Sequence, residues 1–416
     1  MSNAKGKTEN ESEPLENLNK VKGAALSCVH CGQCRVANWP SKGFYYVCPV
    51  YKTDIVPKFE PYFARGKNVI LKGLFWGHLE LNQEISDIIF QCTLCGACED
   101  FCQNAHNESI DFANHRWMEQ IKVFEALRAD LVKAGYSIES QVPMNKALVE
   151  LLNPYGRDNV EKESWIKKLD FKIKDASQEN AEVLYFVGCT AALTPQIQDV
   201  AVKTARIFKK IGIDFAIFGN REICCGSVAM RTGDRYAFTS VAEKNANLFK
   251  EREIKKIVTS CAGCYRTLKK DYGKMLNGIE ILHTIEFLDE LLKEGKLNVK
   301  KLDITTTYHD PCHVGRHMGL YDPPRRILDK ISDFIEMKTN REAAMCCGAG
   351  GGVRKGFPEL SLEMARNRVK EAEATGAEAL VSTCPFCFRN LSDAIDSLNS
   401  SMKMVDLVEL LLDALK

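Results

Sequence analysis

Apolar runs of four or five residues alternate with longer amphipathic stretches through the second half of the chain. The runs have the length and composition of buried strands, and the stretches between them carry apolar side chains at helical spacing. We predict strands at 183–187, 257–260 and 379–383, and helices that include 238–252 and 360–374. Strands that alternate with helices indicate parallel α/β sheets, one within residues 181–295 and another within residues 304–416.

The first half of the chain has a different pattern. Residues 1–20 are polar and lack the apolar core of a secretory signal, so we expect a disordered tail. Residues 21–120 hold two cysteine clusters around a segment with helical periodicity. Residues 121–180 are predicted to be a helical linker with a break at Asn153–Gly156. The apolar segment Val69–Leu79 suits the core-facing side of helices in this region better than contact with a membrane partner or a membrane surface.

The two α/β regions repeat one another at an offset of 123 residues. The repeated positions are Tyr185, Cys189, Val258, Cys261, Cys264, Arg266 and Leu268, which recur as Tyr308, Cys312, Val381, Cys384, Cys387, Arg389 and Leu391. An amphipathic segment repeats at the same offset, because Ile285–Leu292 aligns with Val408–Leu415. A chance cluster of cysteines would not carry a matching helix with it, so we infer an internal duplication.

Composition excludes two classes of function. The chain has 416 residues, of which 45% are hydrophobic and 27% charged, as in an ordinary soluble protein of roughly two to four compact units. Its formal net charge of +1 lacks the basic excess of a nucleic-acid-binding protein. The longest stretch without a charged residue, 183–198, has 16 residues and is too short to span a bilayer.

The cysteine content is the unusual feature of the composition. The chain has 18 cysteines, and without a secretory signal we expect them to stay reduced in the cytoplasm. Most lie at the C-x-x-C spacing that is typical of metal sites. The alternative, scattered buried cysteines without a ligand role, fits such tight clusters poorly. We therefore expect a cytoplasmic metal-binding protein.

The N-terminal cysteines follow the pattern of a bacterial ferredoxin with two 4Fe–4S clusters. In that pattern three closely spaced thiolates bind one cubane and a fourth, distant cysteine completes the other. The first cluster is accordingly assigned to Cys28, Cys31, Cys34 and Cys102. The second is assigned to Cys48, Cys92, Cys95 and Cys98. Zinc is the alternative, but it commonly takes two C-x-x-C pairs in a tetrahedron rather than consecutive triplets.

Two features depart from the compact ferredoxin pattern. Between Cys34 and Cys48 lie 13 residues where three are usual, and Gln103 replaces the proline expected after Cys102. The insert is aromatic, and it contains Trp39, Phe44, Tyr45 and Tyr46. These side chains suit either the shielding of a cluster or contact with a partner. Because residues 49–91 have helical patterns, the region resembles an α-helical ferredoxin domain.

Each α/β region carries five cysteines in the same order: a single cysteine, a Cys-Cys-Gly triplet and a C-x-x-C pair. The first motif is Cys189, Cys224, Cys225, Cys261 and Cys264, and the second motif is Cys312, Cys346, Cys347, Cys384 and Cys387. All are expected at the carboxyl ends of strands, where open α/β sheets place their ligand sites. Five thiolates are one too many for a simple cubane or a zinc tetrahedron. The glycine after each double cysteine permits the backbone bend that lets both face one site.

On these motifs the chain resembles the CCG-domain iron–sulfur proteins, and in particular the catalytic D-type subunits of heterodisulfide reductase. The resemblance covers about residues 22–416. It implies an N-terminal α-helical ferredoxin domain followed by two tandem α/β CCG domains, at 181–295 and 304–416. It also implies that each five-cysteine motif binds a non-cubane 4Fe–4S cluster, so that two cubane and two non-cubane clusters use all 18 cysteines.

The resemblance implies an iron–sulfur oxidoreductase of anaerobic metabolism. In the family, electrons from the cubanes reach the non-cubane clusters, which cleave a disulfide such as the heterodisulfide of coenzyme M and coenzyme B. An external donor is implied, because no flavin, haem or nicotinamide motif is convincing. It would be a flavoprotein, a ferredoxin or a membrane b-type cytochrome that holds the protein at the cytoplasmic face. The alternative is an electron-relay subunit of a larger complex, of the sulfur-metabolism, aromatic-ring reductase or dehydrogenase–quinone type.

Three further groups of residues have two interpretations each. The glycine run Gly348–Gly352 lacks the spacing of a dinucleotide loop, so we expect its backbone N–H groups to face a cluster. His313, one of three histidines near Cys312, is a candidate proton donor to a product thiolate, although a hydrogen-bonded structural histidine is more frequent. Four arginines are candidates for binding an anionic substrate or are solvated surface residues: Arg231, Arg235, Arg316 and Arg354.

Overall fold

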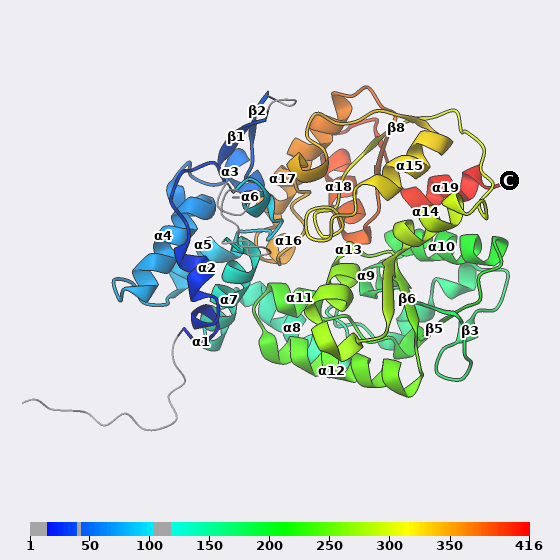
Figure 1. The fold of residues 1–416 in the computed structure, drawn as a ribbon, viewed down its shortest axis with the longest axis horizontal. Helices are drawn as coiled ribbons and strands as arrows, with labels where there is room; N and C mark the ends of the chain where they lie inside the picture. The colour runs from blue at the N-terminus through cyan, green and yellow to red at the C-terminus, as the bar shows by residue number, and fades with distance from the viewer. Residues whose placement is uncertain (1–14, 40–42, 103–117) are drawn as a thin grey trace, which may run out of the picture.

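The structure has three parts that follow the order of the sequence. It is a computed structural model that describes residues 15–39, 43–102 and 118–416. A helical part ends with α7 (Gln120–Lys133), and two parallel sheets with their helices form the other parts (Figure 1). In Figure 1 the helical part is blue to cyan, the first sheet lies in the green part and the second in the yellow to red part. Within the described ranges, no helix is both long and apolar enough to cross a membrane.

Helices of the N-terminal part pack around one apolar core. Its elements are α1 Glu16–Asn19, α2 Lys22–Leu26, α3 Pro49–Lys52, η1 Glu60–Tyr62, α4 Ala64–Phe75, α5 Gln83–Phe90, α6 Ala97–Asp100 and α7. Leu71 of α4, Phe90 of α5 and Leu127 of α7 are fully buried in this core. Asn82 caps α5 by accepting a hydrogen bond from the backbone of Ile85. The helical prediction for the segment between the two cysteine clusters is therefore confirmed.

The aromatic insert forms a β-hairpin that the sequence pattern did not predict. Strand β1 (Val36–Trp39) pairs antiparallel with β2 (Gly43–Tyr46). The Tyr45 ring is buried and meets the Phe101 ring edge-on, with 5.6 Å between centroids. The neighbouring Phe44 side chain is exposed. The side chain of Trp39 and the whole of Gln103 lie outside the described residues.

Both sheets are parallel and have the same strand order. In the first the order is β3 Lys174–Asp175, β5 Phe215–Ile217, β4 Val183–Tyr185, β6 Lys256–Thr259 and β7 Glu280–His283. In the second it is β9 Asp333–Phe334, β8 Thr305–Tyr308, β10 Ala379–Ser382 and β11 Lys403–Asp406. Strands β4 to β7 thus correspond to β8 to β11, and β3 extends the first sheet. The duplication in the sequence is a duplication of structure, and the predicted α/β fold class is confirmed.

The helices of the two α/β parts pack on each other in a reciprocal way. The first part has α8 Val142–Leu151, α9 Cys189–Leu193, α10 Gln198–Lys210, α11 Ser227–Arg231, α12 Arg235–Glu251, α13 Ala262–Arg266 and α14 Thr284–Lys293. The second has α15 Asp322–Ile331, α16 Val353–Gly356, α17 Pro358–Glu373, α18 Pro385–Ser397 and α19 Leu407–Ala414. Helix α10 packs on α19, and α14 packs on α15. Because α10 and α14 correspond to α15 and α19, the contact relates the two copies by an approximate two-fold axis.

Short helical turns connect these elements. They are η3 Glu139–Gln141, η4 Asn159–Glu163, η5 Ile166–Lys168, η6 Pro195–Ile197, η7 Gly219–Arg221, the π-helical turn η8 Thr267–Asp271, η9 Gly273–Leu276 and η10 Arg341–Ala343. The two double cysteines follow η7 and η10 rather than strands. The prediction that all ten cysteines of the two motifs directly follow strands is therefore wrong for the double cysteines.

Two further expectations about the N-terminal half need correction. The tail predicted for residues 1–20 ends earlier, because residues 16–19 form α1, whose buried Leu18 donates its backbone N–H to Asp130 of α7. Residues 1–14 lie outside the described residues. The segment 121–180 is not a separate linker. Its α7 completes the helical core, and its β3 pairs with β5 in the first sheet.

Candidate functional site

The five cysteines of the first motif converge at the carboxyl edge of the first sheet. Cys189 begins α9 just after β4, and Cys261 precedes α13 just after β6. The Sγ atoms of Cys225 and Cys264 lie 3.3 Å apart, and the Cys224 thiol lies close enough to that of Cys189 to raise its pKa. Three separate loops therefore bring all five thiols into one cluster.

The second motif repeats this arrangement. The Sγ atoms of Cys347 and Cys387 lie 3.4 Å apart, and the Cys346 thiol lies close enough to that of Cys312 to raise its pKa. Backbone N–H groups also face sulfur in both copies. Gly226 donates to Cys224 at 3.5 Å, and Gly348 donates to Cys346 at 3.4 Å.

The glycine after each double cysteine is required by the backbone. Gly226 has φ +80° and Gly348 has φ +87°, a region that other residues rarely adopt. A Cβ atom on Gly348 would lie 2.6 Å from the carbonyl oxygen of Ser361, and one on Gly226 would lie 2.8 Å from Val241. The structure thus has the bend that the sequence predicted at these positions.

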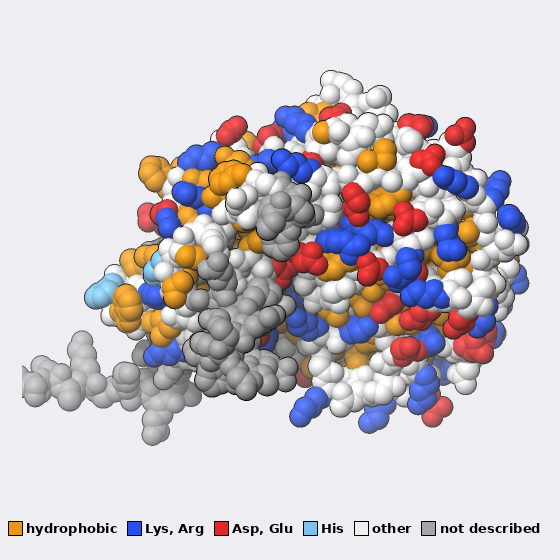
Figure 2. Space-filling model, turned by 45° about the horizontal axis from the view of Figure 1, so that its top comes forward, with side chains coloured by type: hydrophobic (Ala, Val, Ile, Leu, Met, Phe, Trp, Pro, Cys, Tyr) orange, Lys and Arg blue, Asp and Glu red, His pale blue; other side chains and the backbone are white. Residues whose placement is uncertain are grey.

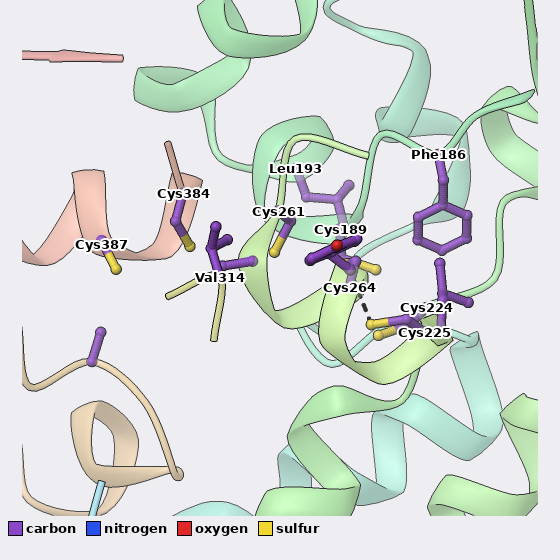
Figure 3. Packing of buried hydrophobic residues seen from close by; sticks show 14 of the residues in the cluster. Phe186, Cys189, Leu193, Cys224, Cys225, Cys261, Cys264, Val314, Cys384 and Cys387 are labelled. Carbon is purple, nitrogen blue, oxygen red and sulfur yellow. Dashed lines mark hydrogen bonds between the residues drawn. The ribbon is translucent and has the colours of Figure 1, made fainter. Parts of the chain in front are cut away.

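All ten cysteines of the two motifs line one cavity of about 630 Å³. Cys261 and Cys384, which occupy the same place in the two copies, lie close enough for each thiol to shift the pKa of the other. Figure 3 shows these two thiols next to Val314, with the rest of the first motif to one side. Because equivalent residues meet, this cavity lies on the approximate two-fold axis. It presents two similar sets of sulfur atoms to whatever it holds.

A second cavity, in the helical part, is lined by Cys48, Cys92, Cys95 and Cys98. These are the four cysteines that the crossed ferredoxin pattern assigns to one cluster. The buried Lys67 lies in the same wall and donates to the carbonyl of Pro61 at 2.8 Å. Burial lowers the pKa of Lys67 to about 8, while the thiolates act to raise it. A buried cation at this place offsets part of the negative charge of four thiolates.

The remaining N-terminal cysteines lie nearer to the surface. Cys31 is exposed, whereas Cys28, Cys34 and Cys102 are half-buried. Burial raises the pKa of Cys34 to about 12, and the nearby Cys28 and Cys31 also contribute to this rise. Cys102 follows α6, and its place with the other three stays a prediction.

The helical part and the second motif meet at their cysteines. The thiol of Cys95 lies close to that of Cys346, and this interaction together with burial raises the pKa of Cys95 well above its usual value. Arg316 holds this contact, since its Nε donates to the Cys95 carbonyl at 2.8 Å and its Nη1 donates to the Ala344 carbonyl at 2.5 Å. No spacing or pattern in the chain indicated this contact, because it depends on how the parts dock.

The chemistry of these donor sets fits bound metal. All 18 cysteines are free thiols, although several Sγ atoms lie within hydrogen-bond distance of each other. Burial raises the pKa of Cys34 and Cys48 to about 12, so the thiolate forms need a positive charge close by. The irons of a cluster supply that charge to the thiolates that bind them.

Known families agree with this geometry. The family described as "Cysteine-rich domain" matches residues 183–269 and 306–392, and the "4Fe-4S dicluster domain" matches residues 24–105. The chain is 37% identical to the D-type subunit of the dihydromethanophenazine:CoB–CoM heterodisulfide reductase of Methanosarcina mazei, with 96% of each chain covered. The chain belongs to this heterodisulfide reductase family. Membership confirms the iron–sulfur character that the cysteine spacing predicted.

Relatives of this heterodisulfide reductase homologue at lower sequence identity include proteins that are named for other redox reactions. The chain is 27% identical to the B-type subunit of the fumarate reductase (CoM/CoB) of Methanothermobacter marburgensis, with 99% of this chain and 76% of the relative covered. It is 28% identical to the EtfAB:quinone oxidoreductase of Syntrophomonas wolfei, with 80% of this chain and 47% of the relative covered. The relatives include subunits of redox complexes that have several subunits.

Three histidines of this heterodisulfide reductase homologue are buried near the second motif: His309, His313 and His317. His313 lines the cavity of the ten cysteines, and its ring lies 4.4 Å from the ring of His317 between centroids. Burial and the charge of Arg231 lower the pKa of His313 to about 3. The neutral ring is therefore favoured near neutral pH, which works against the proton-donor role. That role stays a prediction.

The arginines predicted as substrate ligands are engaged elsewhere. Arg231 lines the cavity but forms buried ion pairs with Glu125 and Asp271. Arg354 pairs with Asp393, and Arg235 and Arg316 donate to backbone carbonyls. The other interpretation, that these arginines are solvated surface residues, is wrong for Arg231 and Arg316, because both are buried.

Sequence reasoning missed two cations in the cavity wall, Arg389 and Lys355. Neither side chain has an ion pair or side-chain hydrogen bond within the described residues. The duplication contains a signal for Arg389, because its counterpart in the first copy is Arg266. Arg266 is buried and pairs with Glu125 and Asp271, whereas Arg389 has no acidic partner in the described part of the chain.

Proposed function

We propose that the protein is an iron–sulfur oxidoreductase that reduces a disulfide held in the cavity of the ten cysteines. Under this proposal the N-terminal sets bind two cubane 4Fe–4S clusters, and the first and second motifs each bind a non-cubane 4Fe–4S cluster. These clusters would supply single electrons to sulfur. The reaction consumes R–S–S–R′, two electrons and two protons and releases R–SH and R′–SH.

One observation carries this proposal. The ten cysteines of both motifs line a single cavity, and the equivalent residues Cys261 and Cys384 meet within it. A disulfide has two sulfur atoms that each receive one electron. A cavity on a two-fold axis, with the same donor set on either side, presents one centre to each sulfur.

The cysteine sets also lie in an order that suits electron transfer. Cys31, the exposed cysteine, belongs to the outermost set. Cys34 of that set is close enough to Cys48 of the next set for their charges to interact. Cys95 of the second set contacts Cys346 of the second motif, and Cys384 of that motif contacts Cys261 of the first. Electrons that enter at the surface would thus reach the second motif before the first.

The charge of the cavity favours an anionic disulfide. Its wall has four basic side chains, Arg231, Arg354, Lys355 and Arg389, and two acidic ones, Glu359 and Asp393. Among the described residues neither Arg389 nor Lys355 forms an ion pair, so both side chains are available to a ligand. The heterodisulfide of coenzyme M and coenzyme B, the substrate named for the Methanosarcina relative, is the leading candidate.

We propose that an electron-donor protein binds to the helical part around Cys31. Fourteen large hydrophobic side chains are exposed in the described residues, and eight of them lie between residues 29 and 79. They are Val29, Phe44, Tyr46, Ile55, Phe59, Val69, Trp76 and Leu79. Figure 2 shows hydrophobic side chains beside Lys and Arg on the left end of the molecule, where this part lies. Exposed apolar side chains in the same part of the molecule as the exposed Cys31 suit a redox partner.

Anaerobic purification with iron and acid-labile sulfide analysis tests the cluster assignment. Four 4Fe–4S centres require about 16 iron atoms per chain. Cys225→Ser and Cys347→Ser should each remove one non-cubane centre and leave the cubane spectra unchanged. An iron content that two cubanes alone explain would refute the proposal.

A second measurement separates the reductase from a relay role. Coenzyme M thiol, added to the oxidised protein, should produce a new paramagnetic signal from a non-cubane centre if the thiol binds there. An unchanged spectrum in a protein with full iron content would favour the relay role instead. Reduced methyl viologen should then support no disulfide reduction.

A further inference from the structure

His309 lies next to two cysteines of the second motif, and the proposed disulfide reduction gives this histidine no role. It follows β8 and its side chain is 1% exposed. One of its ring nitrogens lies within 4.8 Å of the thiols of both Cys347 and Cys387. Its Nε2 has no hydrogen-bond partner in the described part of the chain. A buried polar atom without a partner is costly unless a group absent from the protein chain completes it.

Arg368 fixes which ring nitrogen carries the proton. The Nε of Arg368 donates to Nδ1 of His309 at 3.1 Å, and a guanidinium can only donate. Nδ1 is therefore the acceptor, and the neutral ring carries its hydrogen on Nε2. The arginine is itself held in place, since its Nη1 donates to the carbonyl of Thr339 and to Glu371, both at 2.8 Å. His309 thus presents an N–H donor that nothing in the described chain accepts.

The first copy has an apolar ring at the corresponding position. The offset of 123 residues places Phe186 where the second copy has His309. Phe186 is fully buried, in the same apolar cluster as Cys224 and Cys225 and on the same side of it in Figure 3. The ring packs against Phe249 with 6.4 Å between centroids. The two motifs are otherwise alike in their cysteines and glycine N–H groups, so this position is a specific difference between them.

We propose that His309 is a positioning residue that donates an Nε2–H hydrogen bond to sulfur at the second motif, and that this bond makes the two centres differ in reduction potential. The inference rests on the proposed function, because it requires a cluster at each motif. A hydrogen bond to sulfur stabilises the more negative, reduced form, so it raises the potential of that centre. The centre that electrons reach first would therefore hold an electron more firmly than its counterpart.

An alternative role for His309 is iron ligation through Nε2. A ligating histidine normally donates its other ring N–H to an acceptor. Here the other nitrogen faces the donor Arg368 instead, and ligation would leave both ring nitrogens without a proton. The geometry therefore favours a hydrogen bond to sulfur over a bond to iron.

The test compares three variants of the full chain with intact protein, after iron analysis has shown that all four centres are filled. His309→Phe copies the residue of the first motif, and His309→Gln keeps an N–H donor. Phe186→Leu is the matched control, because it alters the same position in the other copy. Redox titration with dithionite, followed by electron paramagnetic resonance, measures the potential of each non-cubane centre.

His309→Phe should lower the reduction potential of one non-cubane centre by about 59 mV, which corresponds to a tenfold change in its one-electron equilibrium constant. The potential of the other non-cubane centre should stay unchanged. His309→Gln should restore most of that change, and Phe186→Leu should not affect the same centre. Equal potentials in His309→Phe and intact protein would overturn the inference, as would iron loss from that centre in His309→Gln. If His309→Phe does not fold, intact protein labelled with ¹⁵N-histidine provides the test. An electron paramagnetic resonance signal of the non-cubane centres without coupling to a histidine nitrogen would also overturn the inference. Intact protein with only two cubanes would refute the proposed function instead.

Discussion

At the scale of single residues, Arg389 offers a direct test of substrate charge. It lies in the cavity wall near the hydroxyl of Tyr155, which is 2.9 Å from Thr190 Oγ1 beside Cys189. Arg389→Gln should raise the KM for bis(2-sulfoethyl) disulfide by about tenfold, because one charged hydrogen bond is lost. The KM for the neutral bis(2-hydroxyethyl) disulfide should stay the same, with reduced methyl viologen as the donor.

The control for this change is Arg366→Gln, which removes an arginine that bonds Glu363 and Ser397 on the same copy. It should leave the KM of both disulfides unchanged. Equal losses with the charged and the neutral disulfide in Arg389→Gln would show a packing role rather than charge recognition.

The candidate ligands could be predicted at this scale because cysteine spacing carries the information. Cys48, Cys92, Cys95 and Cys98 line one cavity, in the set that the crossed pattern assigned. The environment of a residue is harder to predict. Arg231 has the same charge as Arg389, but partners from distant segments, such as Glu125, neutralise it. Only the folded chain shows which charges remain without a partner.

At the scale of elements, the glycine loop after Cys347 packs against the helical part. Gly351 has φ +64°, and a Cβ there would lie 2.7 Å from the Cys92 carbonyl oxygen and 2.8 Å from the Thr93 carbonyl carbon. Gly351→Ala combines the strain of a positive φ, about 1 kcal/mol, with overpacking of about 1–3 kcal/mol. We expect a lower thermal midpoint, measured anaerobically by circular dichroism.

Gly376→Ala is the matched control for the loop. Gly376 has φ +75°, but a Cβ there meets nothing within 4 Å, so only the strain remains. The two variants should unfold at clearly different temperatures. Equal thermal midpoints for the two variants would mean that the glycine loop shifts to accept the added methyl group without disturbing the turn at Cys92.

Strand and helix types were predictable in the α/β half because the duplication provided two versions of each pattern. The predicted helix 238–252 is α12 at Arg235–Glu251, and 360–374 is α17 at Pro358–Glu373. The hairpin β1–β2 was missed because its pairing depends on a local turn and on Tyr45 packing against Phe101. Strand β3, with two residues, is too short to leave a periodic signal.

At the scale of the whole molecule, the order of the three parts was predictable, but their docking was not. The contacts Cys95–Cys346 and Cys261–Cys384 join residues that no spacing relates. The second contact follows from the two-fold packing of α10 with α19 and of α14 with α15, whereas the first depends on how the helical part docks on the second motif, where Arg316 bonds the Cys95 and Ala344 carbonyls. Duplication predicts that two motifs exist, whereas the interface between the copies decides that both open into one cavity.

Arg128 forms hydrogen bonds to all three parts. Its side chain is 0% exposed, and the guanidinium lies 4.7 Å from the centre of the Phe90 ring. Nη2 donates to the carbonyl of Cys92 in the helical part, and Nη1 donates at 2.7 Å to those of Arg231 and Gly351 in the two α/β parts. Removal of this donor would leave several buried carbonyls without a partner, at about 1–3 kcal/mol each.

Arg128→Met should therefore lower the free energy of unfolding by about 3 kcal/mol or more, with the volume of the side chain largely kept. It should also separate the unfolding of the helical part from that of the α/β parts, because the bonds that couple them are lost. Differential scanning calorimetry of the iron-loaded protein measures both effects. Arg206→Met is the control, since Arg206 is exposed and donates to the Lys168 carbonyl at 2.9 Å, and its loss should matter little. A single transition at the original temperature in Arg128→Met would show that the docked parts are held by their apolar contacts and thiol pairs alone.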